Sequence, residues 1–282
     1  MIAVGTMTWA REANEAEARS MYSLARERGV VWFDSASSYS DGEAERILGR
    51  CLRDDPRRDE VLISTKGGYR GERLDAEIMG SLKRIGTDFV ELYLHHHWAK
   101  HGTWDAAVQL DEVTLMRQAR WIGLSNCLAW QAAAVHSSFG LRAIQILYSL
   151  AKRGAESELI PFAADSGVQV FAYSPIAAGA LACRGQQRLK DDTRYAHRFS
   201  DCAIPLDFEA MCADLGQTPA QLAVAWCEAH PSGLVIPIIG ARNATQLEEL
   251  LARKEIDADQ WRAVASLFPA PQHPTGRIEE EP

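Results

Sequence analysis

Residues 89–125 read FVELYLHHHWAKHGTWDAAVQLDEVTLMRQARWIGLS. The stretch begins and ends in short apolar runs, at 89–95 and 120–125, with a longer amphipathic segment between them. Short runs rich in β-branched and apolar residues predict buried strands, and helical periodicity predicts a helix between them. A strand–helix–strand unit of this kind predicts two parallel strands joined by a right-handed crossover.

The same alternation continues along the whole chain. Capping residues support the helices: Asn14 precedes a helical segment that closes at Gly29, Thr218 and Pro219 open another, and Asn243 opens a third. Eight units in about 240 residues favour a single-domain α/β fold, a closed (β/α)8 TIM barrel, over a doubly wound sheet, which usually has fewer strands. The eight predicted strands span residues 2–5, 30–34, 60–65, 89–95, 120–125, 143–148, 168–173 and 234–240.

We predict that the barrel domain covers residues 1–270 and that 271–282 form a flexible tail. The longest irregular segment, 175–205, contains several basic residues, and loops of this length are usually functional or disordered. These basic residues are Arg184, Arg188, Lys190, Arg194 and Arg198.

Composition narrows the class of protein. The chain has 282 residues, 47% of them hydrophobic, and a net charge of −8, which argues against a nucleic-acid partner. Its six cysteines form no CxxC pair, which is typical of reduced thiols in a reducing compartment. We see no signal peptide and no transmembrane segment, and therefore expect a cytoplasmic protein without a membrane partner. The sequence does not indicate the oligomeric state.

Polar residues stand at the predicted carboxyl ends of the strands, where the active sites of (β/α)8 enzymes lie. A single lysine or tyrosine at a strand end is more often structural than catalytic. Polar residues at the ends of most strands, all on one rim, predict a functional site. They are Asp34, Tyr39, Lys66, the histidines at 95–97, Ser125, Asn126, Gln145, Tyr173, Ser174 and the residues 240–243.

Several motifs on this rim resemble those of the aldo-keto reductase superfamily. FDSASSYSDGEAERILG (33–49), ISTKGG (63–68) and ELYLHHHW (91–98) are similar to the segments that carry the family's catalytic residues. WIGLSN (121–126), AYSPIAAGAL (172–181) and GARNATQLEEL (240–250) are similar to its later motifs. The resemblance runs in collinear order from about residue 3 to residue 252. The family often carries an N-terminal hairpin that plugs the barrel, and we expect it to be reduced or absent here, because the first predicted strand starts at residue 2.

Residues 95–97 are three consecutive histidines, which could form a metal site or contain one functional residue with two neighbours. Successive side chains of a strand point to opposite faces, so three in a row do not converge on one ion. Aligned on ELYL, the resemblance makes His96 the family's histidine. We expect His95 to be a packed or rim residue and His97 to border the substrate pocket.

The resemblance implies a reductase mechanism. Tyr39 would be the general acid, Lys66 its electrostatic partner, Asp34 the anchor of that lysine, and His96 the residue that orients the carbonyl. Because side chains carry no hydride, a nicotinamide cofactor is implied. The substrate would be a small aldehyde, ketone or sugar-like carbonyl compound.

The resemblance also assigns the cofactor contacts. It places Ser125, Asn126 and Gln145 on the carboxamide, Tyr173 against the ring, and Arg242 at the ribose 2′-phosphate. NADPH is therefore preferred, with NADH possible, and the basic loop either covers the pyrophosphate or is a solvated charged segment. The other predicted cofactor contacts are Gly5, Thr6, Met7, Ser174, Ile176, Gly240, Gln246 and Glu249.

The substrate-binding residues and the biological role remain open at the level of sequence. Trp9, Trp98 and Trp130 follow strands and either wall an aromatic pocket or cap the rim; Trp9, His97 and Trp98 are the predicted substrate contacts. An alternative to the enzyme is an NADPH-binding regulator with little turnover, similar to the potassium-channel β subunits. A barrel isomerase or hydrolase without nicotinamide is a third reading, because fold alone does not fix function.

Overall fold

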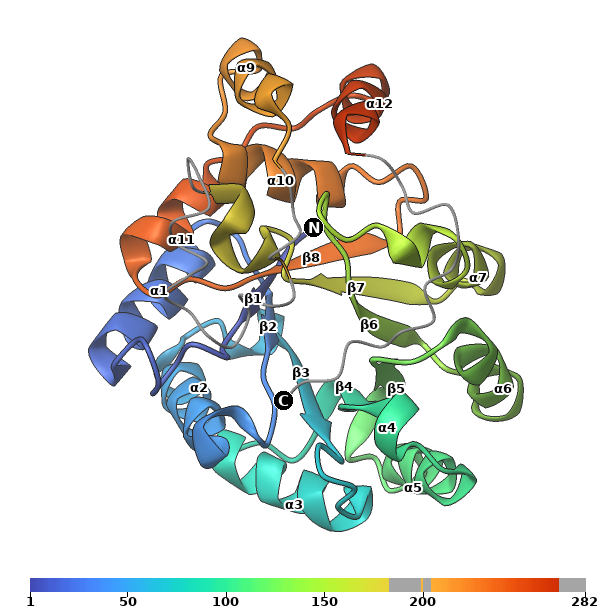
Figure 1. The fold of residues 1–282 in the computed structure, drawn as a ribbon. Helices are drawn as coiled ribbons and strands as arrows, with labels where there is room; N and C mark the ends of the chain where they lie inside the picture. Colours follow the sequence, from blue (N-terminus) through green and yellow to red (C-terminus); the bar gives the residue numbers. More distant parts are fainter. Residues whose placement is uncertain (183–198, 200–203, 269–282) are drawn as a thin grey trace.

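The computed structural model describes residues 1–182, 199 and 204–268. Its eight strands are all parallel, each pairs with the next along the chain, and β8 pairs with β1 to close the barrel (Figure 1). The predicted TIM barrel is confirmed, with strand ends shifted by one or two residues. The strands are β1 (Ala3–Gly5), β2 (Trp32–Asp34), β3 (Leu62–Gly67), β4 (Val90–His95), β5 (Ala119–Ser125), β6 (Ala143–Leu147), β7 (Gln169–Tyr173) and β8 (Val235–Ile239).

Helices surround the barrel and begin where the capping residues predict. Asn14 accepts a hydrogen bond from the Glu17 N–H, Thr218 from the Gln221 N–H, and Asn243 from the Gln246 N–H. The helices are α1 (Glu15–Glu27), α2 (Glu43–Asp54), α3 (Leu74–Ile85), α4 (Trp98–His101), α5 (Trp104–Leu115), α6 (Ala129–Phe139), α7 (Leu159–Ser166), α9 (Leu206–Asp214), α10 (Pro219–Glu228), α11 (Ala244–Leu251) and α12 (Ala258–Leu267). Short 3-10 turns are η1 (Tyr39–Gly42), η2 (Arg58–Glu60), η3 (Gly154–Glu156) and η4 (Ala177–Ala182).

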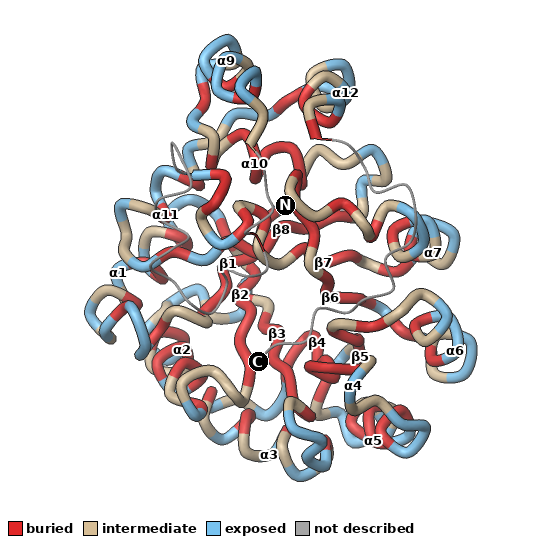
Figure 2. Tube along the Cα trace, in the orientation of Figure 1, coloured by how far each residue is buried: buried red, intermediate tan, exposed pale blue. Residues whose placement is uncertain are grey.

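The core has two layers. One lies between the strands and the helices, whose inner faces are buried and outer faces exposed (Figure 2). The other fills the barrel interior, where Trp32 and Phe171 lie 5.0 Å apart between ring centroids, with Trp121 packed against the same cluster. These large side chains make the lower barrel a packed interior, so the open space of the barrel lies at the carboxyl ends of the strands.

Strand register brings the predicted catalytic residues together. Asp34, the last residue of β2, pairs with Ser64 of β3. Because side chains two residues apart share a face, Lys66 lies on the same side as Ser64, one step closer to the rim. The carboxylate and the ammonium therefore meet at the top of the barrel.

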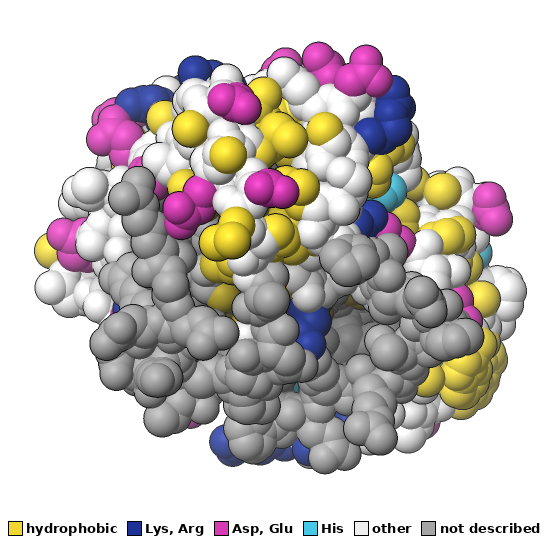
Figure 3. Space-filling model, turned by 45° about the horizontal axis from the view of Figure 1, so that its top comes forward, with side chains coloured by type: hydrophobic (Ala, Val, Ile, Leu, Met, Phe, Trp, Pro, Cys, Tyr) yellow, Lys and Arg dark blue, Asp and Glu magenta, His cyan; other side chains and the backbone are white. Residues whose placement is uncertain are grey.

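Two of the predicted segments lie outside the residues that the structure describes. The predicted tail 271–282 and the basic loop with Arg184, Arg188, Lys190, Arg194 and Arg198 fall outside the described residues. Among the helices that are described, none has the length and apolar character needed to cross a membrane. Acidic, basic and apolar side chains are interspersed over the described part of one face (Figure 3).

Candidate active site

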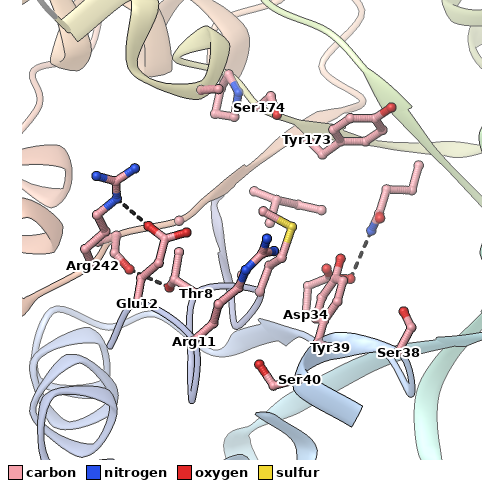
Figure 4. Close-up of a pocket in the computed structure, with 18 of the residues that line it drawn as sticks. Thr8, Arg11, Glu12, Asp34, Ser38, Tyr39, Ser40, Tyr173, Ser174 and Arg242 are labelled. Carbon is pink, nitrogen blue, oxygen red and sulfur yellow. Dashed lines mark hydrogen bonds and ion pairs between the residues drawn. The ribbon is translucent and has the colours of Figure 1, made fainter. Parts of the chain in front are cut away.

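A cavity of about 1140 Å³ opens at the carboxyl ends of the strands (Figure 4). Residues at the carboxyl ends of several strands and in the segments that follow them line it, so the wall is assembled from distant parts of the chain. Tyr39 and Asp34 lie near one end of the cavity, and Arg242 with Glu12 at the other. We refer to these as the catalytic end and the ribose end, after the roles that the resemblance predicts for their residues.

Lys66 is the centre of the catalytic end. Its side chain is fully buried, and its Nζ donates to Asp34 Oδ2 at 2.7 Å and to the Ser35 carbonyl at 2.6 Å. The same nitrogen lies 3.3 Å from the hydroxyl of Tyr39, whose half-buried ring lines the cavity. Lys66 itself stands behind the wall, where it can act on Tyr39 but not reach a substrate.

The Asp34 carboxylate is held on both oxygens. While Oδ2 accepts from Lys66, Oδ1 accepts from the Ser64 hydroxyl at 2.7 Å and from Gln145 Nε2 at 2.9 Å. Burial lowers the pKa of Lys66 below its usual value, and the nearby Asp34 carboxylate opposes that shift. A buried charge pair is tolerable only when its remaining hydrogen-bonding capacity is satisfied, as it is here.

The three consecutive histidines occupy three different environments. His95, the last residue of β4, packs against Trp98, and burial lowers its pKa to about 4. His96 lines the cavity, 5.8 Å from the Tyr39 ring, with its Nδ1 3.4 Å from the Ser38 hydroxyl. His97 stacks on His96 at 5.4 Å, because β4 ends at His95 and the alternation of faces stops there.

Backbone strain is concentrated at this rim. Seven of the eight non-glycine residues with positive φ in the described chain lie in segments that follow strands; the exception is Arg117. Ser40 and Asp41, directly after Tyr39, are both left-handed and lead into Gly42, which has φ +81°. Such conformations cost free energy and cluster at functional sites. The seven are Ala10, Ser40, Asp41, Asn126, Ser174, Ala177 and Ala178.

The middle of the cavity carries the residues predicted to bind nicotinamide. The Tyr173 hydroxyl donates to Asn126 Oδ1 at 2.7 Å, and Asn126 Nδ2 donates to the His96 carbonyl at 3.0 Å. Gln145 uses its amide nitrogen on Asp34, so its amide oxygen can accept from a carboxamide NH2. This set offers both amide donors and acceptors beside an aromatic ring.

The ribose end is formed by the segments after β1 and β8. Arg242 Nε lies 2.5 Å from Glu12 Oε2, and the Thr8 hydroxyl donates to the Ala241 carbonyl at 2.6 Å. The Arg242 N–H donates to Gln246 Oε1 at 3.0 Å. A guanidinium on an exposed turn at the start of α11 is well suited to a phosphate.

Most of the predicted site residues line the cavity together. They are Asp34, Tyr39, His96, Gly5, Met7, Ser125, Asn126, Gln145, Tyr173, Ser174, Ile176, Gly240, Arg242, Gln246 and Glu249.

Four of the predicted contacts are not brought to the wall. Thr6 is fully buried and donates to the Ser35 hydroxyl, so it faces away from the cavity. Trp9 is also fully buried, Trp98 packs beneath the rim against His95, and His97 lies behind His96. In this structure the rings of Trp9 and Trp98 fill space under the loops, which is the second of the two alternatives that the sequence left open.

Sequence reasoning missed part of the wall. Tyr69 lines the cavity and stands 5.0 Å from the His96 ring, with Arg70 beside it after β3. Thr8, Arg11 and Glu12 line the cavity from the segment after β1. Their position just beyond predicted strand ends was the available signal.

The residues present fit a nicotinamide dinucleotide. The cavity, at about 1140 Å³, is larger than the roughly 300 to 1,000 Å³ that is usual for small-molecule sites. A Cβ built on Gly240 meets nothing within 4 Å, so this wall residue leaves open space beside its backbone. Amide groups, an aromatic ring and a guanidinium follow one another along the same cavity.

Comparisons with known proteins agree with this geometry. A model of the aldo/keto reductase family matches residues 1–268. The uncharacterized oxidoreductase YrpG of Bacillus subtilis (strain 168) is 33% identical over 96% of this chain and 92% of its own. A probable voltage-gated potassium channel subunit beta of Arabidopsis thaliana is 26% identical over 86% of this chain and 83% of its own.

Among solved structures, an aldo-keto reductase from Klebsiella pneumoniae in complex with NADPH is similar to this chain at 25% identity. The match has a TM-score of 0.75 and covers 97% of this chain and 93% of the other. The chain belongs to the aldo/keto reductase family of oxidoreductases.

Proposed function

We propose that the protein is an NADPH-dependent reductase of aldehydes, ketones or sugar-like carbonyl compounds, with Tyr39 as its general acid. One observation carries this proposal. The Tyr39 hydroxyl, on the cavity wall, lies 3.3 Å from a lysine ammonium that is fully buried and 2.7 Å from a carboxylate.

The chemistry follows from this arrangement. When bound in this cavity, NADPH would supply the hydride for the carbonyl carbon, and the residues of the wall would have to neutralise the negative charge that develops on the carbonyl oxygen. Tyr39 donates its proton to that oxygen, and the Lys66 ammonium stabilises the phenolate that remains. Asp34 keeps Lys66 charged and in place. His96, which shares the wall with Tyr39, orients the carbonyl oxygen toward the phenol.

Arg242 supports NADPH over NADH, because a guanidinium fork matches a 2′-phosphate and has less to gain from a 2′-hydroxyl. The Klebsiella pneumoniae relative in complex with NADPH supports the same choice. Ser125, Asn126 and Gln145 would hold the carboxamide, and Tyr173 the ring face.

The test is to follow NADPH oxidation with a panel of aldehydes, ketones and sugars for the wild type and Tyr39→Phe. We expect kcat to fall by about a thousandfold in Tyr39→Phe while NADPH binding, measured by fluorescence titration, is unchanged. Tyr22→Phe is the matched control, because the Tyr22 hydroxyl bonds Asp55 outside the cavity. Equal rates for wild type and Tyr39→Phe would exclude Tyr39 as the proton donor.

A cofactor-binding regulator is the second candidate. It is favoured by the similarity to proteins described as probable potassium channel β subunits of Arabidopsis thaliana and rice. Tight NADPH binding without turnover of any carbonyl compound in the panel would support the regulator and contradict the reductase.

A further inference from the structure

Glu12 and Arg242 form an ion pair across the ribose end of the cavity. Arg242 Nε lies 2.5 Å from Glu12 Oε2, and both residues line the cavity (Figure 4). Glu12 belongs to the segment between β1 and α1, and Arg242 to the turn between β8 and α11. The Glu12 carboxylate is therefore already paired with the guanidinium that is proposed to bind the 2′-phosphate.

The Glu12 segment is held in place by its own hydrogen bonds. The Glu12 N–H donates to the Thr8 carbonyl at 2.8 Å, and the Thr8 hydroxyl donates to the Ala241 carbonyl at 2.6 Å. The Glu12 side chain is 22% exposed against 45% for Arg242. These bonds hold the Glu12 backbone next to residue 241, so the ion pair is not a chance contact of two free surface side chains.

A second acidic residue at the ribose end, Glu249, has a different partner from Glu12. Glu249 also lines the cavity, but its carboxylate accepts from the Thr218 hydroxyl at 2.9 Å. Glu12 is thus the carboxylate placed to compete for Arg242.

The two nicotinamide cofactors would meet this pair differently. A 2′-phosphate that binds Arg242 must displace the Glu12 carboxylate, and the two anions then repel each other at short range. A 2′-hydroxyl carries no charge and can donate a hydrogen bond to the carboxylate, in the way that acidic residues accept from the ribose hydroxyl in NAD sites of other folds.

We infer that Glu12 is a specificity-determining residue for the cofactor, one that weakens the preference for NADP(H) over NAD(H) that Arg242 creates. The inference rests on the proposed nicotinamide site and adds a residue that sets its selectivity. Removal of the negative charge at position 12 should shift the preference toward the phosphorylated cofactor.

The experiment measures dissociation constants by calorimetry, so it requires no substrate and no turnover. The probes are NADP+, NAD+, 2′,5′-ADP and 5′-ADP, each titrated into wild type, Glu12→Gln, Arg242→Gln and the double variant. We expect Glu12→Gln to bind NADP+ and 2′,5′-ADP about tenfold more tightly, with NAD+ and 5′-ADP unchanged or weaker. Glu12→Gln should give no such gain in the Arg242→Gln background.

Glu248→Gln is the matched control. Glu248 lies on α11, forms an ion pair with Arg28 and does not line the cavity. The variant therefore removes the same charge without changing the surroundings of Arg242. It should change none of the four constants by more than about twofold, because exposed charges at a distance are screened. Melting curves of each variant establish that it is folded.

Three results would overturn the inference: equal changes for NADP+ and NAD+ in Glu12→Gln, a weaker binding of NADP+ in that variant, or the same gain in Glu248→Gln. Binding of neither dinucleotide to the wild type would overturn the proposed cofactor site as well. Normal binding with no turnover, in contrast, would contradict the proposed reductase and leave the role of Glu12 standing.

Discussion

The two ends of one cavity are built in different ways. At the catalytic end, Asp34 and Lys66 project from neighbouring strands and are almost completely buried, with their polar atoms bonded to one another. At the ribose end, Glu12 and Arg242 come from two connecting segments, and the arginine side chain is 45% exposed.

The difference follows from what each end has to do. Proton transfer depends on atoms held in fixed positions, and strands of a closed barrel hold them better than loops. Discrimination between cofactors needs only a few kcal/mol, which charges on connecting segments can supply. Substitutions at the catalytic end should therefore affect rate and stability together, whereas those at the ribose end should affect affinity alone.

The largest effect is expected at Lys66. Lys66→Met removes the cation beside Tyr39, and we expect kcat to fall by about a thousandfold. It also leaves the Asp34 carboxylate buried without its ionic partner, which should lower the free energy of unfolding by about 3 kcal/mol. Stopped-flow or steady-state rates and urea unfolding measure the two effects.

Two variants sharpen this prediction. The double variant Asp34→Asn, Lys66→Met removes both charges, so it should recover part of the stability and none of the rate. Lys83→Met, on the exposed face of α3, should change neither. Loss of stability without loss of rate in Lys66→Met would contradict the assignment of Lys66 to the chemistry.

The catalytic end should also be the more sensitive to acid, because His95 is buried beneath it. Burial lowers the pKa of His95 from 6.5 to about 4, so the unfolded chain binds the proton more readily. Stability from this group is complete above pH 6.5 and is lost as the pH falls toward 4. At pH 5 the free energy of unfolding is lower by about 2 kcal/mol for this reason, which corresponds to a fall of about 3 °C in Tm.

His95→Leu tests this by removing the titrating group. Melting curves at pH 7 and pH 5 should show a smaller acid-induced fall in Tm for His95→Leu than for wild type. His136→Gln, a half-buried histidine on α6, is the control and should keep the wild-type fall. An unchanged pH dependence in His95→Leu would show that other groups cause the acid sensitivity.

The smallest effect concerns the left-handed backbone after Tyr39. Asp41 has φ +53°, and glycine adopts this conformation at no steric cost, so Asp41→Gly should raise stability by up to about 1 kcal/mol. Arg117→Gly, at φ +58° on the turn after α5, should give a similar gain far from the cavity. Thermal unfolding measures both.

The kcat values of these two variants show whether the strained turn after Tyr39 contributes to activity. If the strained turn positions Tyr39, Asp41→Gly should lower kcat severalfold, while Arg117→Gly leaves kcat unchanged. Equal rates in both variants would mean that the turn at Ser40 and Asp41 connects elements and does not tune the site.

The fold and the catalytic end were predictable from the sequence because their signals are local. Eight apolar runs and helix caps such as Asn14 and Thr218 each report on a few neighbouring residues, and parallel strands then place Asp34 and Lys66 on one rim. His96 was predicted by the resemblance, from its place after the ELYL segment, and it lines the cavity.

The sequence left open whether the tryptophans line the cavity, and the reason is physical. Trp9 and Trp98 follow strands, and position along the chain does not tell whether a large ring turns into a cavity or packs under a loop. Burial of apolar surface decided the orientation of both rings, which are almost completely buried. His97 is a similar case, since its place beside His96 depends on β4 ending at His95.

What the sequence determined by itself is the barrel and the rim of polar side chains on it, because hydrophobic periodicity and strand register repeat along the chain. What only the tertiary structure decided is which side chains from different connecting segments meet. Tyr69 stands against His96, and Glu12 pairs with Arg242, although nothing in the local sequence links them. Such contacts depend on loop paths that hydrogen bonds such as Thr8 to Ala241 fix only after the barrel has closed.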